Sequence, residues 1–227
     1  MKIWRFSDPS KAEYARASRR GSWAGSPSRR VRPLVIEWEP GSDVVGDFTW
    51  PGFDSELVVK ESVANALQEA EVPGFEFCAI EMLENSEPAK RRSKERRVEL
   101  PYSGSNLGEL HVTTWTRLDR ERSTVTEVKN EDGTTHVVPR GVQHMEQTWD
   151  RDRAELITRL HPRVAGEGLV VRETNGIFRI QELPAWVFCT DDVKRVIDEH
   201  GFTNVRFLEM GDTLDESAIR TTRTGGS

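Results

Sequence analysis

Hydrophobic and polar positions alternate along the chain in a pattern that recurs after 130 residues, with Val63 aligned to Val193. Each copy reads as a short apolar run, an acidic helix start, a helical stretch, a turn and a second apolar run. We therefore expect strand-helix-strand units at residues 57–77 and 187–207. Unrelated units of this kind also share such a pattern, so duplication and independent origin both stay open.

The second unit carries the clearer helix signals. Thr190 is a candidate N-cap, and Asp191 and Asp192 suit the positive helix N-terminus. Gly201 is placed to end the helix. Between these ends the apolar residues form a stripe at helical spacing, made of Val193, Val196 and Ile197.

Strand and hairpin signals dominate the rest of the chain. "KIWRF" at residues 2–6 and "PLVIEWEP" at residues 33–40 predict strands. Asp132-Gly133 and Asn175-Gly176 each separate two apolar or alternating runs, and both dipeptides predict a β-hairpin.

Three further segments are assigned from composition and spacing. Residues 8–33 are rich in Ser, Gly, Pro and Arg and are expected to be too polar to pack. "DRDRAELITRLHP" at residues 150–162 predicts a helix, because Ala154, Ile157 and Leu160 are three apart and Pro162 would end it. "GSNLGELH" at residues 104–111 is interpreted as a turn.

Taken together, these elements predict an α+β fold with mostly antiparallel sheets, two similar strand-helix-strand units and β-hairpins. The length of 227 residues allows one domain over 1–227. Two lobes are also possible, with the first unit in residues 1–100 and the hairpins and second unit in residues 101–227.

Composition indicates a soluble protein, with 36% hydrophobic and 31% charged residues. No apolar run approaches the roughly 20 residues that span a bilayer, and the N-terminus lacks the pattern of a signal peptide. We expect a cytoplasmic protein without a membrane partner. Cys78 and Cys189 lie in apolar runs, where a reduced thiol acts as a small hydrophobe.

Motifs for metal, nucleotide or nucleophilic chemistry are missing from the sequence. The histidines form no closely spaced pair and the two cysteines are far apart, so neither a structural zinc nor any other cofactor is expected. The candidate catalytic residues are His144 and the nearby Glu146. They would serve a hydrolase-like enzyme with a carboxylate and histidine site in a cleft between the two units.

Two basic runs, at residues 19–32 and 90–97, raise the question of nucleic-acid binding. The net charge of -6 and the glutamates on both sides of the second run argue against it. Solvated loops are the favoured interpretation, and nucleic acid is an unlikely partner.

The segments "LPAWVFCTDDVKRVIDEHGFTNVRFLEM" and "TWPGFDSELVVKESVANALQEAEVPGFEFCAIEM" resemble the paired units of bacterial immunity proteins against polymorphic toxins, in particular the double-CxxCG group. In that group a short N-terminal strand, a central strand-helix-strand unit and a C-terminal one recur in this order, and "MKIWRF" fits the first. The resemblance covers about a third of the chain and rests on hydrophobic patterns.

Both CxxCG motifs of that group are missing from this chain, so the zinc they would bind does not carry over. The resemblance implies a cytoplasmic, non-enzymatic immunity protein that binds a cognate protein toxin and covers its active surface. A structural or phage-associated accessory protein is a third possibility, beside the enzyme.

Charge distribution suggests where a partner would bind. Nine acids and three bases lie between Glu182 and Glu216, which gives this segment a charge of -6. Many toxins act on nucleic acids or nucleotides and carry basic surfaces, so an acidic face would speed their encounter. The expected partner-binding residues are Glu209, Asp212, Asp215 and Glu216.

Overall fold

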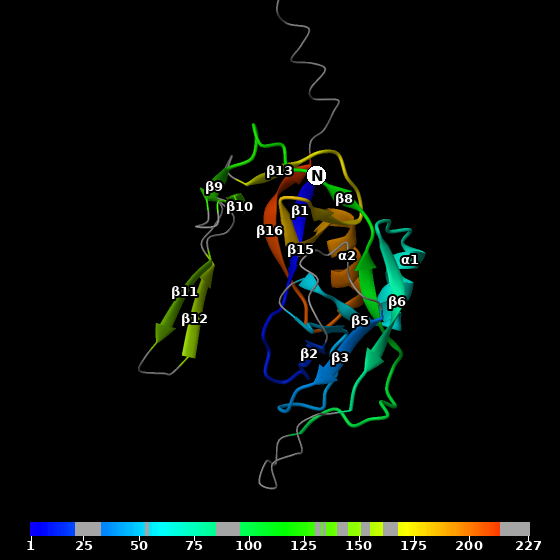
Figure 1. Cartoon of the computed structure of the whole chain (residues 1–227). Coiled ribbons are helices and arrows are strands. Elements are labelled where there is room, and N and C mark those ends of the chain that lie inside the picture. The colour runs from blue at the N-terminus through cyan, green and yellow to red at the C-terminus, as the bar shows by residue number, and fades with distance from the viewer. Residues whose placement is uncertain are drawn as a thin grey trace, which may run out of the picture.

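The computed structural model describes residues 1–20, 33–52, 55–84, 96–129, 133, 135–139, 145–150, 155–160 and 168–213 (Figure 1). Two mixed six-stranded sheets, two helices and two separate two-stranded sheets make up this part of the chain. The predicted α+β class is confirmed, in a form rich in β-structure.

One six-stranded sheet is built around the N-terminal strand. Its strand order is β13 (Leu169–Val171), β16 (Arg206–Thr213), β1 (Lys2–Ser7), β15 (Leu183–Thr190), β14 (Ile177–Ile180) and β8 (Trp115–Thr116). Helix α2 (Asp191–His200) leads from β15 to β16, and β1 runs antiparallel between these two strands. The apolar stripe of α2 is buried as expected, and Gly201 ends the helix with a left-handed φ of 64°.

The other six-stranded sheet has the order β2 (Ala17–Arg20), β3 (Leu34–Trp38), β6 (Phe75–Met82), β7 (Leu107–Val112), β5 (Val58–Lys60) and β4 (Phe48–Thr49). Helix α1 (Glu61–Glu69) leads from β5 to β6, and β7 runs antiparallel between them. Residues 57–77 and 187–207 therefore each contain a strand, a helix and a second strand.

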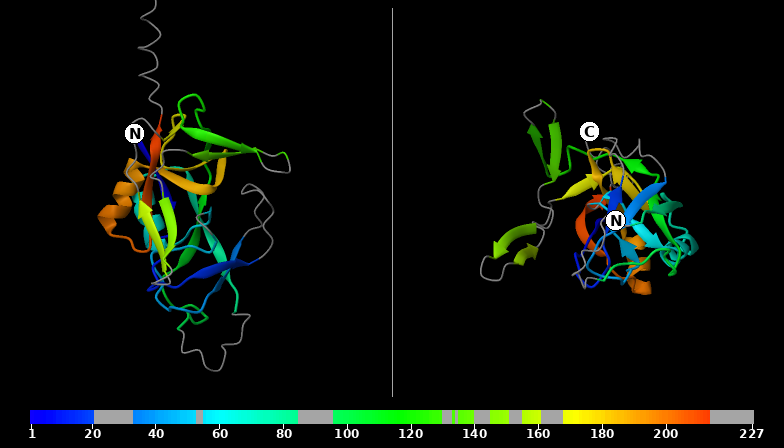
Figure 2. Two further views of the ribbon diagram at one scale, coloured as in Figure 1. Left: turned by 90° about the vertical axis from the view of Figure 1, so that its left-hand side faces the viewer. Right: turned by 60° about the horizontal axis from the view of Figure 1, so that its bottom comes forward.

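The two helices meet in a core that both sheets share (Figure 2). Val63 and Leu67 of α1 are buried in the same cluster as Val193 and Ile197 of α2. Removing this apolar surface from water is the main term that holds the two sheets together. Cys189 is buried in this core, where desolvation raises the pKa of its thiol well above its ordinary value.

Hydrogen bonds join the turn after α2 to the loop before β4. The Asp47 carboxylate accepts hydrogen bonds from the Thr203 hydroxyl at 2.6 Å, the Thr203 backbone N–H at 2.8 Å and the Lys60 ammonium at 3.1 Å. Burial acts to raise the pKa of Asp47, but these donors outweigh it and hold the pKa below its ordinary value. The ionised carboxylate is thus part of the contact between the sheets.

The hairpin predicted at Asp132-Gly133 is confirmed by β9 (Val125–Lys129) and β10 (Thr135–Pro139). The helix predicted at residues 150–162 is wrong. Residues 155–160 form strand β12 (Glu155–Leu160), which pairs with β11 (Met145–Asp150). The helical pattern rested on three apolar residues, whereas the β-branched pair Ile157-Thr158 suits a strand once a partner strand is available.

The hairpin predicted at Asn175-Gly176 is also wrong, because β13 pairs with β16 and β14 pairs with β15. A tight hairpin turn of this type needs a positive φ at both residues, and of these two only Gly176 has one, at 71°. A Cβ on Gly176 would lie 2.2 Å from the Pro73 carbonyl oxygen. This glycine allows close contact between the two sheets.

Two segments that were not predicted to be strands belong to the second sheet. Residues 17–20, inside the stretch 8–33, form the edge strand β2, with Ala15 and Ala17 buried; residues 21–32 lie outside the described ranges. "GSNLGELH", interpreted as a turn, contains most of β7. Gly108 in this strand leaves room for the Phe77 ring, which a Cβ would approach to 2.5 Å.

The helices that the structure describes include none with the length and apolar character needed to cross a membrane.

Candidate functional site

The described part of the structure does not show the proposed catalytic residues, His144 and Glu146, forming a site. His144 lies outside the described residues. Glu146 is placed only by its backbone, in β11 opposite Arg159 of β12. The described residues therefore supply no arrangement of side chains that supports the enzyme alternative.

The proposed partner-binding acids are placed in part. Glu209 and Asp212 lie on β16, where the Lys2 ammonium of β1 contacts their carboxylates at 2.9 and 3.4 Å. Their side chains remain 26% and 40% exposed. Lys2 thus gives both acids a local partner that the sequence did not indicate, while Asp215 and Glu216 fall beyond the described ranges.

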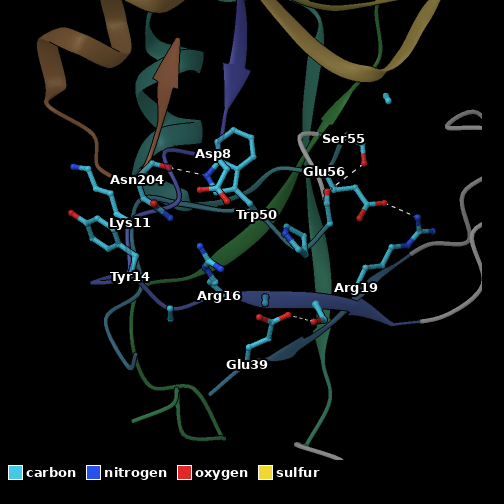
Figure 3. Close-up of a pocket in the computed structure, with 16 residues that line it drawn as sticks. Asp8, Lys11, Tyr14, Arg16, Arg19, Glu39, Trp50, Ser55, Glu56 and Asn204 are labelled. Carbon is cyan, nitrogen blue, oxygen red and sulfur yellow. Dashed lines mark hydrogen bonds and ion pairs between the residues drawn. The ribbon is translucent and has the colours of Figure 1, made fainter. Parts of the chain in front are cut away.

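A cleft of about 840 Å³ lies beside the edge strand β2 (Figure 3). Its lining comes from the N-terminal segment with β2, the residue after β3, the loop after β4, one residue of β15 and one residue of the turn after α2. The residues are Asp8, Lys11, Tyr14, Ala15, Arg16, Ala17, Ser18, Arg19, Glu39, Trp50, Pro51, Gly52, Ser55, Glu56, Ala185 and Asn204. This volume lies within the range of known ligand pockets.

Trp50 occupies the middle of the cleft, with Lys11 and Tyr14 on one side and Arg19 and Glu56 on the other (Figure 3). The Trp50 indole N–H donates to the Asn204 backbone carbonyl at 2.8 Å, which ties the cleft to the turn after α2. Trp50 is fixed by this bond and by stacking against Phe48. The cleft therefore has a rigid aromatic centre.

The strongest ion pair in the cleft joins β2 to the loop before β5. The Arg19 guanidinium lies 2.7 Å from the Glu56 carboxylate, and the two side chains are only 14% and 1% exposed. The backbone N–H of Arg19 also donates to the Pro51 carbonyl at 2.5 Å. Arg19 thus holds the loop that forms one wall of the cleft.

The other acids of the cleft are also held by neighbouring groups. The Ser18 hydroxyl donates to the Glu39 carboxylate. Asp8 accepts a hydrogen bond from the Ser10 backbone N–H at 2.7 Å. These bonds fix the acids as acceptors inside the protein's own network.

The cations of the rim are held less firmly. Arg16 is exposed and forms no ion pair with any residue that the structure describes. Lys11 is exposed too, and its contact with Glu13 is long at 3.9 Å. The charged residues that line the cleft comprise three acids and three bases, so their formal charges sum to zero.

Asn204 supplies a buried acceptor. Its backbone is left-handed at a φ of 59°, and its side-chain amide donates to the Phe48 carbonyl at 2.8 Å. The side-chain oxygen is buried and accepts no hydrogen bond from the described part of the chain. A buried acceptor without a donor carries a desolvation cost.

Sequence analysis missed this cleft because it treated residues 8–33 as a single polar stretch. A signal was available in residues 15–18, "ARAS", where small and polar residues alternate with the period of a strand. Among the described residues, no group of three or more His, Cys, Asp and Glu side chains is arranged to hold a metal ion.

No protein-family model matches the chain, and no curated protein shows significant similarity to its sequence.

Proposed function

We propose that this chain is a non-enzymatic, protein-binding immunity protein that neutralises a cognate bacterial toxin by covering its active surface. The observation that carries the proposal is the cleft beside β2. Its acids are held by Arg19, Ser18 and backbone groups, and the exposed cations Arg16 and Lys11 lie on the rim. Such an arrangement of charged side chains around a cleft suits recognition of a partner's surface.

The order of the elements supports the same proposal. A short N-terminal strand, a first strand-helix-strand segment and a second one follow each other along the chain, as β1, β5-α1-β6 and β15-α2-β16. This is the order that the resemblance to double-CxxCG immunity proteins implies. Cytoplasmic location and a protein partner are parts of the proposal.

The test is neutralisation and binding of the proteins encoded next to the gene. Co-expression in a bacterial host should restore growth against one toxic neighbour, and calorimetry should show a complex with that purified protein. Reversing Asp212, Asp215 and Glu216 to lysine should slow association and flatten its salt dependence, because an acidic face steers a basic partner. Glu81→Lys, an exposed change on β6 of the other sheet, is the control. If no adjacent gene product binds the chain or loses toxicity, the proposal is wrong.

We further propose that the two strand-helix-strand segments are repeats of one unit. β7 and β1 occupy equivalent positions, each between the two strands of its unit. In both sheets, the residues that pair with the central strand are related by one offset of 130 positions. Val58, Val59, Cys78 and Ala79 pair with β7, and the residues 130 positions later, Phe188, Cys189, Leu208 and Glu209, pair with β1.

The neighbouring strands support the repeat. β4 and β14 each pair antiparallel with the first strand of the unit, and β3 and β13 each pair parallel with the second. The units differ in where the central strand comes from. β7 follows its unit along the chain, whereas β1 precedes both units.

A circular permutant tests the repeat, because the end of β16 lies beside the start of β1. The Thr213 backbone N–H donates to the Met1 carbonyl at 2.9 Å, so a short Asn-Gly turn can join them. A chain running from residue 8 to residue 213, then through this turn to residues 1–7, should fold. Its free energy of unfolding should lie within about 1 kcal/mol of that of residues 1–213, measured in urea.

A second permutant, opened between Gly108 and Glu109, interrupts the central strand of the other sheet and should not fold. An unfolded first permutant would mean that folding requires β1 at the start of the chain. The repeat hypothesis would then lose its support.

A further inference from the structure

We draw no further inference here: the strongest candidate, the cleft beside the edge strand β2, belongs to the site already described, and because its lining charges sum to zero and the Ala15 and Arg19 backbone N–H groups already donate to Val44 and Pro51, no feature of the described residues selects an occupant for it.

Discussion

Replacing Gly74 with alanine should lower the free energy of unfolding by about 4 kcal/mol, measured by urea denaturation. Gly74 follows α1 with a left-handed φ of 94°, at the point where this turn meets β14 of the other sheet. A Cβ at this position would lie 1.9 Å from the Ile177 carbonyl oxygen. Strain in the left-handed region and separation of the two backbones both contribute to the loss.

Gly201→Ala is the matched control. Gly201 follows α2 with a φ of 64°, but a Cβ there would have no atom within 4 Å. The change should therefore cost only the strain of the left-handed conformation, about 1 kcal/mol. Equal losses in the two variants would show that the close approach between Gly74 and β14 does not limit the packing of the sheets.

Replacing Arg19 with methionine should cost about 3 kcal/mol of stability, because it leaves the Glu56 carboxylate buried without its closest cation. The volume of the side chain is roughly kept, so the loss of charge pairing dominates. The deficit is measured by urea denaturation.

Two comparisons separate this pairing from general effects of the substitution. The double variant Arg19→Met with Glu56→Gln should recover much of the loss, because no charge is left buried. Arg195→Met removes an exposed arginine that pairs with Asp192 and Glu199 on α2, and should cost less than about 1 kcal/mol. An Arg19 variant as stable as the Arg195 variant would mean that the ion pair does not hold the wall of the cleft.

Prediction of the candidate site from sequence failed for a physical reason. The cleft needs β2, and the buried positions in and just before β2 are the alanines Ala17 and Ala15 in place of large apolar residues, so the hydrophobic signal is weak. The buried Glu56 is indistinguishable in sequence from the many solvated acids, because only the fold brings Arg19 to it across 37 positions. The acids Glu209 and Asp212 were identified as a charged group, but their contact with Lys2 joins opposite ends of the chain.

The sequence by itself determined the elements whose signals are local. Helix α2 follows from its acidic start, apolar stripe and terminal glycine, and strands β1 and β3 follow from short apolar runs. The same signals located α1 and the turns after both helices. These features depend on residues within one or two turns of each other, so neighbouring side chains suffice to specify them.

Tertiary structure alone decided which strands pair and what the ambiguous segments become. Residues 155–160 form a strand because β11 completes their backbone hydrogen bonds. Gly176, where a hairpin was expected, instead packs closely against Pro73. β1 lies between β15 and β16 although more than 170 residues separate it from either in the chain. Pairing of this kind is selected by burial of a whole sheet face and by hydrogen bonds between distant strands, which no local window of the sequence contains.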